Sequence, residues 1–212
     1  MFEQGTSSIE KQEEGASFAE PDVTRPAILL HSCCGPCSTA VVERLAQRFR
    51  IAIYFCNSNI DDETEYKKRL ETQKLYVERY NASHRKTEPI ILICAPYAPS
   101  AFLKLVEGKE ECEEGGARCR LCINDRLEKT AAYAIMNSYE YFSTTLSVSR
   151  FKNYKMILEL GTALALRYGL SFFGEDYKKG GGELRAVELA RMFGLDRQNH
   201  CGCRFSKRPV ER

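Results

Sequence analysis

Hydrophobic and polar positions divide this chain into two kinds of segment. Apolar runs of about five residues are typical of buried strands, and longer segments with apolar residues at helical spacing are typical of helices. The apolar runs predict strands at residues 27–31, 51–56, 90–94, 141–146 and 170–174. The helical spacing predicts helices at 38–50, 61–80, 100–106, 119–137, 154–168 and 183–193, with Gly169 as the stop signal of the fifth helix.

Strands that alternate with helices favour right-handed crossovers and a parallel sheet covered by helices on both faces. The sequence therefore predicts an α/β fold, a three-layer Rossmann-like parallel sheet, and its 212 residues are enough for a single domain, which we expect to span residues 26–212. In such sheets ligands bind beyond the carboxyl ends of the strands, and the loop after the first strand is the usual centre of that crevice. This loop is predicted at residues 32–38.

The first 25 residues, 1–25, are rich in Glu, Gln, Ser and Gly, which predicts a disordered tail. They lack the apolar segment of a secretory signal, and no apolar run approaches the roughly 20 residues of a membrane-spanning helix. We therefore expect a cytoplasmic protein. In that reducing compartment the ten cysteines are better explained by metal or redox chemistry than by disulfide bonds.

Seven of the cysteines fall into three groups, which are Cys33, Cys34 and Cys37, then Cys119 and Cys122, then Cys201 and Cys203. The first group stands where a nucleotide-binding α/β protein carries its glycine-rich phosphate loop. The second lies at a predicted helix start, where the helix dipole lowers thiol pKa values and the i, i+3 spacing lets both thiols face one ion. The third flanks Gly202, whose conformational freedom permits a tight turn.

Thiolates without histidine ligands favour zinc or iron-sulfur chemistry, and four of them suffice for a zinc ion or a 4Fe-4S cluster. Three thiols then remain. Adjacent residues such as Cys33 and Cys34 point in different directions, so they are suited to two neighbouring metals. The pattern therefore favours a cluster next to a single metal ion, and one structural zinc site with three spare thiols is the alternative.

The other three cysteines and the histidines receive simpler interpretations. Cys56 and Cys94 end predicted strands and are interpreted as buried small hydrophobic residues. Cys112, in an acidic loop, is interpreted as an incidental exposed thiol. His31 and His200 each neighbour a cysteine group, where a histidine more often forms hydrogen bonds than binds the metal itself.

The formal net charge of +2 does not by itself indicate a nucleic-acid-binding protein. Basic residues nevertheless gather beside three predicted loops, and solvated surface charge is the alternative interpretation of each group. These groups are Arg150, Lys152 and Lys155, then Lys178, Lys179 and Arg185, then Arg204, Lys207, Arg208 and Arg212.

Six stretches carry a resemblance to a known family. They are LLHSCCGPCS at 29–38, NSNI at 57–60 with EYKKR at 65–69, RCRLC at 118–122 with RL at 126–127, TTLSVS at 144–149 with KN at 152–153, KKGG at 178–181, and RQNHCGCRFS at 197–206. In this order they resemble the cobalamin-independent epoxyqueuosine reductases of the QueH type. Ile123 and His200 stand where that family usually has tyrosine, so a role for tyrosine there does not carry over.

The resemblance implies the last step of queuosine synthesis, in which the epoxide of epoxyqueuosine at the wobble position of a tRNA is reduced to the cyclopentene of queuosine. It also implies an adenine-nucleotide-hydrolase-like fold and a 4Fe-4S cluster beside a mononuclear metal, an iron. We expect the cluster on Cys34, Cys119, Cys122 and one of Cys201 or Cys203, with Cys201 preferred. The lone metal would then take Cys33, Cys37 and the remaining thiol.

Reduction of an epoxide requires two protons as well as two electrons, and Asp176, Tyr177 and His200 are the candidate proton donors. A tRNA anticodon arm presents phosphates and splayed bases. Lys152, Lys155, Lys178, Lys179 and Arg204 are the predicted phosphate contacts, and Tyr154, Tyr177 and Phe205 the predicted stacking faces. An electron-donor protein is the second expected partner.

Two other functions remain open on the sequence. One is an ATP-dependent tRNA sulfur-transfer enzyme of similar fold, although residues 33–38 lack the phosphate loop that it needs. The other is a zinc-stabilised RNA-binding module.

Overall fold

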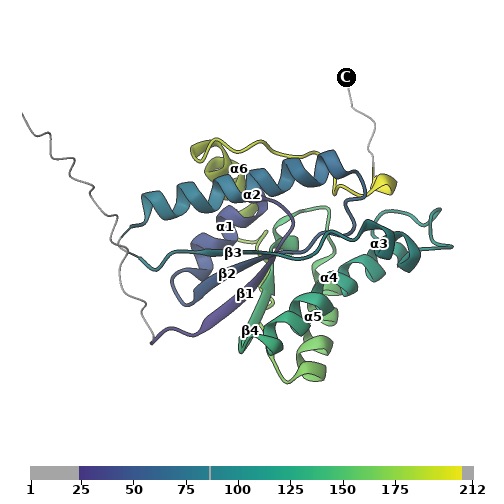
Figure 1. Ribbon diagram of the computed structural model, residues 1–212, viewed down its shortest axis with the longest axis horizontal. Helices are drawn as coiled ribbons and strands as arrows, with labels where there is room; N and C mark the ends of the chain where they lie inside the picture. Colours follow the sequence, from purple (N-terminus) through teal and green to yellow (C-terminus); the bar gives the residue numbers. More distant parts are fainter. Residues whose placement is uncertain (1–23, 86, 207–212) are drawn as a thin grey trace, which may run out of the picture.

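The computed structural model describes residues 24–85 and 87–206, and in these a parallel five-stranded sheet has the order β3-β2-β1-β4-β5 (Figure 1). The strands are β1 (Ala27–Ser32), β2 (Arg50–Phe55), β3 (Ile91–Cys94), β4 (Tyr141–Thr144) and β5 (Ser171–Phe172). The helices are α1 (Gly35–Leu45), α2 (Glu63–Ser83), α3 (Pro99–Leu105), α4 (Ala117–Met136), α5 (Tyr154–Tyr168) and α6 (Gly182–Met192), with 3-10 turns η1 (Thr145–Val148) and η2 (Arg204–Ser206). The predicted three-layer α/β fold is confirmed.

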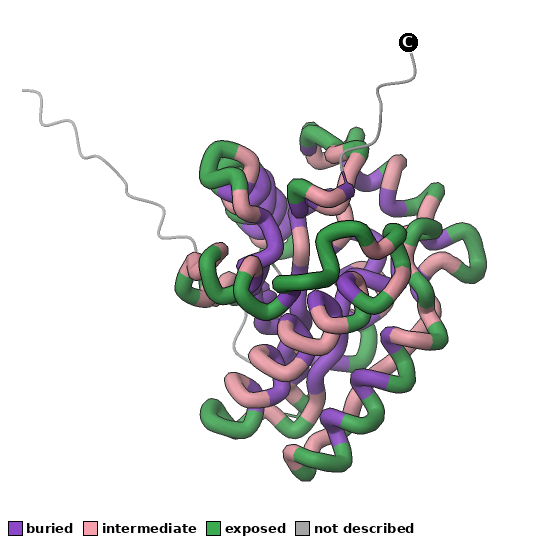
Figure 2. The backbone as a smooth tube through the Cα atoms, turned by 90° about the vertical axis from the view of Figure 1, so that its right-hand side faces the viewer, coloured by how far each residue is buried: buried purple, intermediate pink, exposed green. Residues whose placement is uncertain are grey.

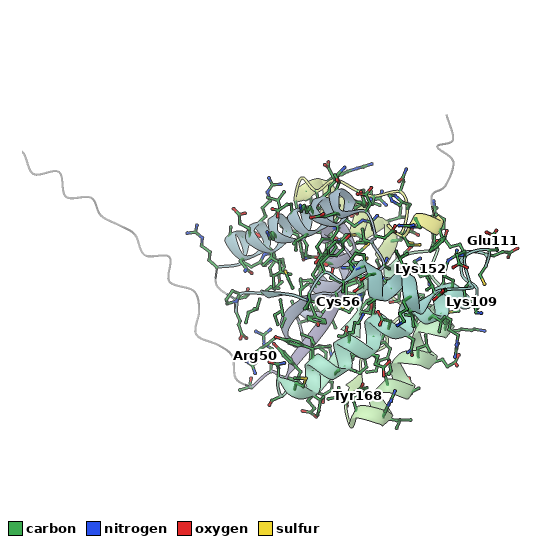
Figure 3. All side chains as sticks on the ribbon, turned by 45° about the vertical axis from the view of Figure 1, so that its right-hand side comes forward. Arg50, Cys56, Lys109, Glu111, Lys152 and Tyr168 are labelled. Atoms are coloured by element: carbon green, nitrogen blue, oxygen red, sulfur yellow. The ribbon has the colours of Figure 1, made fainter. Side chains whose placement is uncertain are left out.

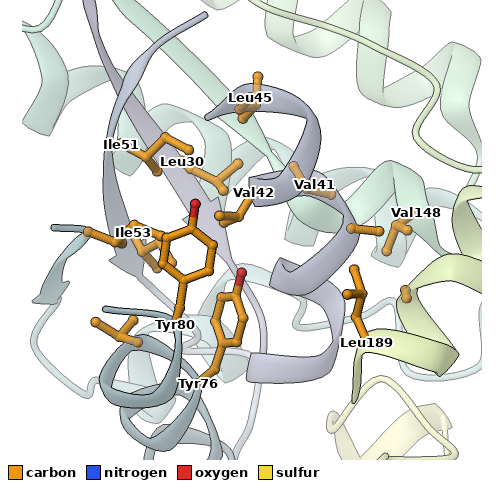
Figure 4. Close-up of a cluster of buried hydrophobic side chains, with 14 of the residues drawn as sticks. Leu30, Val41, Val42, Leu45, Ile51, Ile53, Tyr76, Tyr80, Val148 and Leu189 are labelled. Atoms are coloured by element: carbon orange, nitrogen blue, oxygen red, sulfur yellow. The ribbon is translucent and has the colours of Figure 1, made fainter. Parts of the chain in front are cut away.

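Helices cover both faces of the sheet. Helices α1, α2 and α6 pack on one face, and α4 and α5 pack on the other (Figure 1). Strand β1 supplies both interfaces because successive side chains of a strand point to opposite faces. Leu30 contributes to the cluster under α1, α2 and α6, whereas Leu29 contributes to the cluster under α4 and α5. Figure 4 shows the first cluster, in which Tyr76 and Tyr80 of α2 lie against the strands.

The strand order places a switch point at the centre of the sheet. From β1 the chain moves outward to β2 and β3, and it then returns to β4 on the other side of β1. The connections that follow β1 and β4 therefore run to opposite sides of the sheet. Open α/β sheets bind their ligands at the carboxyl ends of two such strands. Cys33 follows β1 and Thr145 follows β4, and their Sγ and Oγ1 atoms are 3.8 Å apart.

Three expectations about elements need correction. Helix α1 begins at Gly35, so most of the predicted loop 32–38 is strand or helix, because a proline is well tolerated in the first helical turn. Strand β4 ends at Thr144, whose side chain caps the 3-10 turn η1. Strand β3 is an edge strand rather than a buried one, with Ile91 59% exposed, and Cys94 at its end is exposed instead of buried.

Burial follows the layers, and the strands at the centre of the sheet lie in the interior (Figure 2). Many residues of the connecting loops are exposed, but residues 56–60, which follow β2, are buried. The predicted tail 1–25 lies outside the described residues, except for its last two. Its disorder therefore remains a prediction, and so does the single domain. Within the described ranges no helix combines the length and the apolar character that crossing a membrane requires.

Candidate metal centre

The first cysteine group lies at the amino end of α1. Cys34 is the residue that precedes the helix, and Cys37 lies in its first turn. Their Sγ atoms are 3.1 Å apart, and that of Cys33 is 4.0 Å from that of Cys34. All three Sγ atoms lie within 4.8 Å of one another, a spacing that suits ligands of a bound metal. None of the three forms a disulfide.

Buried polar side chains fix this turn. The hydroxyl groups of Ser32 and Ser38 lie 2.7 Å apart, and each can donate to the carbonyl oxygen of Cys34 or to Gln73 Oε1. Ser32, Ser38 and Gln73 are fully buried. Because leaving such groups unpaired costs about 1–3 kcal/mol each, the network holds the cysteine turn in one conformation.

His31 belongs to the strand that leads into this turn. Its Nδ1 lies 2.9 Å from Thr144 Oγ1, and its Nε2 lies 3.2 Å from the carbonyl oxygen of Cys56. Burial lowers the pKa of His31 to about 3, so the ring is neutral at physiological pH. As expected from the sequence, His31 is a hydrogen-bonding residue that joins β1 to its two neighbouring strands.

The second and third groups meet at the other side of the site. Cys119 and Cys122 lie in the first two turns of α4, as predicted, and Cys122 packs with Cys203 in a small buried cluster. The Sγ atoms of Cys201 and Cys203 are 3.6 Å apart. The backbone N–H of Gly115 donates to the Sγ of Cys119 at 3.2 Å. Two segments more than 75 residues apart therefore bring four thiols into one neighbourhood.

The thiol pKa values in these groups differ. Hydrogen bonds with Cys34 and Cys37 lower the pKa of Cys33 well below its usual value, and a hydrogen bond with Cys203 does the same for Cys201. The pKa of Cys122 is raised by burial rather than lowered, contrary to the expectation from its place near the helix start. Each of the first and third groups does contain one readily ionised thiol.

The segment that carries Cys201 and Cys203 is anchored by α2 and the loop before it. Arg69 is buried, and its guanidinium pairs with Glu65 at 2.6 Å and donates to the carbonyl oxygen of His200 at 3.0 Å. Asn59 Nδ2 donates to the carbonyl oxygen of Cys201 at 3.4 Å. Gly202 has a φ of +93°, a conformation that other residues rarely adopt.

A cavity of about 510 Å³ joins the first and third groups. Its walls include Cys33, Cys34, Cys37 and Cys201, together with Thr145 beyond β4. Electrostatic interactions of Cys122 with Cys119 and Cys201 connect the second group to the same site. The volume is within the range of small-molecule sites, roughly 300–1,000 Å³. The first and third cysteine groups therefore line one cavity at the carboxyl end of the sheet, and the helix that carries the second group contributes Arg126 to its wall.

Positive charge surrounds the thiols. Arg69, Arg126 and Lys152 line the cavity, and both arginines are buried. Figure 3 labels Lys152, whose ammonium group pairs with Glu114 at 3.5 Å. Burial opposes the charge of Lys152, but the thiols of Cys201 and Cys119 help to raise its pKa. Ion pairs with Glu65 and Glu114 balance the charges of Arg69 and Lys152, whereas Arg126 forms no ion pair among the described residues.

The three predicted proton donors do not lie together. His200 lines the cavity, with its Nδ1 3.1 Å from Asn199 Oδ1. Tyr177 is 1% exposed, and its hydroxyl lies 3.3 Å from Ser143 Oγ in the core. Asp176 lines a different cavity and pairs with Lys178 at 3.3 Å. Neither Asp176 nor Tyr177 lines the thiol cavity, and the burial of Tyr177 also removes it as a stacking face.

The predicted RNA-contacting residues differ in whether they already form ion pairs within this chain. Lys152, Lys178 and Arg204 pair with acidic residues of this chain, which are Glu114, Asp176 and Asp61. Lys155 and Lys179 are exposed and form no ion pair among the described residues. These two lysines are therefore the more available phosphate contacts. The cluster residues Lys207, Arg208 and Arg212 lie outside the described ranges.

The other two predicted stacking residues have internal partners. The hydroxyl of Tyr154 donates to the carbonyl oxygen of Gly174 at 3.0 Å, and the ammonium group of Lys178 lies 5.7 Å from its ring centre. Phe205 packs beside the buried thiols, and the guanidinium of Arg118 lies 4.8 Å from its ring centre. Tyr154 lines the same second cavity as Asp176, whereas Phe205 lines neither cavity.

Sequence comparisons identify the family of this chain. The sequence model of the family "Epoxyqueuosine reductase QueH" matches residues 28–209, which include all seven clustered cysteines. The chain belongs to the QueH family of epoxyqueuosine reductases. A QueH protein of Staphylococcus aureus is 42% identical over 190 residues, which cover 88% of this chain and 78% of that relative. QueH proteins of Streptococcus pyogenes and Thermotoga maritima are 37% and 34% identical, covering 90% and 84% of this chain and 74% and 89% of those relatives.

Membership of the QueH family places the chain among oxidoreductases, and it does not favour the sulfur-transfer or zinc-module alternatives. Ile123, one of the two positions where this sequence departs from the family pattern, is 2% exposed and packs from α4 into the core. It therefore has no place in the cavity. His200, the other departure, does line it.

Several cavity residues were not predicted as parts of the site, among them Arg69, Arg126 and Phe151. Arg69 and Arg126 lie in helical stretches, where an arginine ordinarily faces solvent. Phe151 is 47% exposed at the cavity, with the guanidinium of Arg150 4.9 Å from its ring centre. The available signal was proximity in sequence, because Arg126 follows Cys122 by one helical turn and Phe151 lies within a predicted basic group.

Proposed function

We propose that this protein reduces the epoxide of epoxyqueuosine in tRNA to the alkene of queuosine, as the names of its QueH relatives imply for those proteins. The observation that supports the proposal is a cavity large enough for a modified nucleoside, lined by the first and third cysteine groups, with Cys122 of the second group packed against Cys203 of the third. In the reaction two electrons and two protons enter, both carbon–oxygen bonds of the epoxide break, and the oxygen leaves as water.

The donor set fits an iron-sulfur centre. Seven thiols exceed the needs of one four-coordinate ion, and no histidine ring replaces them. We propose that Cys34, Cys119, Cys122 and one of Cys201 or Cys203 hold a 4Fe-4S cluster, and that the other thiols hold a mononuclear iron. When bound, this centre supplies low-potential electrons and a Lewis-acidic metal, with the electrons delivered to it by a separate electron-carrier protein.

The chain's own side chains contribute binding and protons. His200 is the candidate proton donor that lines the cavity, and Lys152 provides a second N–H group there. Leu146 and Val148, both buried, give part of the cavity wall an apolar surface. Lys155 and Lys179 are positioned on the exposed surface to contact tRNA phosphates outside the cavity.

The exposed aromatic ring of Phe151 is the stacking surface that the structure favours. It stands at the cavity, and an arginine beside the ring adds positive charge. Unstacked bases of RNA loops bind such faces. We propose that a base of the anticodon loop stacks on Phe151 while the modified nucleoside enters the cavity.

The test is an anaerobic incubation of reconstituted protein, a chemical reductant and tRNA that carries epoxyqueuosine, followed by mass analysis of the nucleosides. We expect conversion to queuosine, and we expect Cys34→Ser to abolish it. Cys94→Ser is the matched control, because Cys94 is exposed at the sheet edge and lines neither cavity. Persistence of the epoxide with an intact cluster in the wild-type protein would refute the proposal.

A further inference from the structure

The most unusual charge in the site belongs to Arg126 of α4. Its side chain is buried, with 4% of the residue exposed, and it lines the thiol cavity. Its Nε donates to the carbonyl oxygen of Cys122 at 3.2 Å, a neutral acceptor in its own helix. No carboxylate of the described chain forms an ion pair with it.

A second buried arginine of the cavity, Arg69, has the counter-ion that Arg126 lacks. Arg69 also lines the cavity, but Glu65 neutralises it from one helical turn away. An isolated buried charge costs far more free energy than a paired one, so natural proteins supply a counter-ion. Among the described residues no carboxylate supplies such a counter-ion for Arg126.

Arg126 lines the same cavity as Cys33 and Cys201, and it is hydrogen-bonded to the backbone of Cys122. Burial opposes its charge, yet Cys122, Cys33 and Cys201 raise its pKa. The guanidinium thus lies where the three segments converge. A metal centre held by thiolates carries net negative charge, and it would supply the missing counter-ion.

We propose that Arg126 is the counter-charge of the thiolate-held metal centre and that it raises the reduction potential of that centre. This inference rests on the iron-sulfur centre of the proposed function, but not on its substrate. Reduction adds one negative charge to the centre, and a fixed positive charge beside it favours the reduced form. Potentials of such clusters depend on net charge, hydrogen bonding and solvent exposure. Arg126 acts through the metal centre and is thus a positioning residue rather than a catalytic one.

The test compares Arg126→Met with Arg126→Lys, which keeps the charge, and with Arg167→Met. The last removes an exposed arginine of α5 that pairs with Glu128, so it controls for the loss of one positive charge. The midpoint potential of each anaerobically reconstituted protein is measured by redox titration without tRNA. We expect Arg126→Met to shift the one-electron equilibrium at least tenfold toward the oxidised form, about 59 mV to more negative potential. Arg126→Lys and Arg167→Met should stay close to the wild-type value.

An unchanged potential in Arg126→Met would overturn the proposal, and so would a wild-type protein that binds no iron. If Arg126→Met fails to hold the centre, chelator competition replaces the titration. Weaker iron retention in Arg126→Met than in Arg126→Lys then supports the counter-charge, whereas equal loss in both overturns it. If Arg126→Met shifts the potential as expected but the wild-type protein leaves epoxyqueuosine unreacted, the proposed function is refuted and this inference still stands.

Discussion

The turn between Cys201 and Cys203 offers a sharp test of how the site is built. Replacement of Gly202 by alanine places a Cβ atom 2.9 Å from Ile60 Cγ1 and 3.0 Å from Arg69 Cζ, at a φ of +93°. A non-glycine residue in such a conformation costs about 1–3 kcal/mol. Ile60 and Arg69 are both buried, so the extra atom adds overpacking of about 1–3 kcal/mol. We expect a total cost of roughly 2–6 kcal/mol, concentrated at the third cysteine group.

The control is Gly169→Ala at the end of α5. Gly169 has a φ of +66°, but a Cβ there meets no atom within 4 Å. This variant therefore carries the backbone cost without the overpacking and without any link to the cysteines. The two variants differ in what surrounds the added methyl group.

The assay measures how well each variant retains iron against a chelator, together with denaturant unfolding of the metal-free protein. Because about 1.4 kcal/mol corresponds to a factor of ten, Gly202→Ala should lower metal affinity at least tenfold. Gly169→Ala should lower stability by about 1–3 kcal/mol and leave metal affinity unchanged. Equal metal affinity in both variants would refute the assignment of Cys201 and Cys203 to the metal centre.

Three further predictions concern the core, the buried histidine and the cavity entrance. Leu127→Ala removes a fully buried side chain beneath α4 and should destabilise the protein by about 2–5 kcal/mol in denaturant unfolding; a change below 1 kcal/mol would contradict the packing described. His31 has a pKa of about 3 when folded against 6.5 when unfolded, so the unfolded state takes up its proton first and the metal-free protein should lose about 1.4 kcal/mol per pH unit as pH falls from 6.5 toward 3. His31→Gln should lack this contribution, and parallel stability-pH curves for the two proteins would rule it out. Phe151→Ala should weaken tRNA binding by about 1–3 kcal/mol in a binding titration, whereas Phe151→Tyr should keep it; equal affinities of all three proteins would exclude stacking.

The periodicity of the sequence was sufficient for the order of elements, because each strand and helix carries its own apolar pattern. Helix α5 was predicted with its observed bounds and with Gly169 at its end in the left-handed conformation. The position of β3 in the sheet could not be predicted in this way. An apolar run looks the same in an edge strand and in a central strand, so Ile91 and Cys94 were wrongly placed in the interior.

The candidate site, too, could be predicted from the sequence only in part. Cysteine spacing identified the three groups, because chain neighbours such as Cys119 and Cys122 must lie close together on a helix. Which distant side chains face them depends on tertiary packing. Tyr177 is close in sequence to basic residues but lies in the core, whereas Arg126 looks like a surface residue of α4 and is buried at the cavity.

We propose that thiols from three distant segments of this chain hold more iron than a single 4Fe-4S cluster contains. Iron, zinc and acid-labile sulfide should be measured per chain in protein purified under strictly anaerobic conditions. We expect sulfide together with more iron than one 4Fe-4S cluster holds, and little zinc. Zinc without iron or sulfide would contradict it.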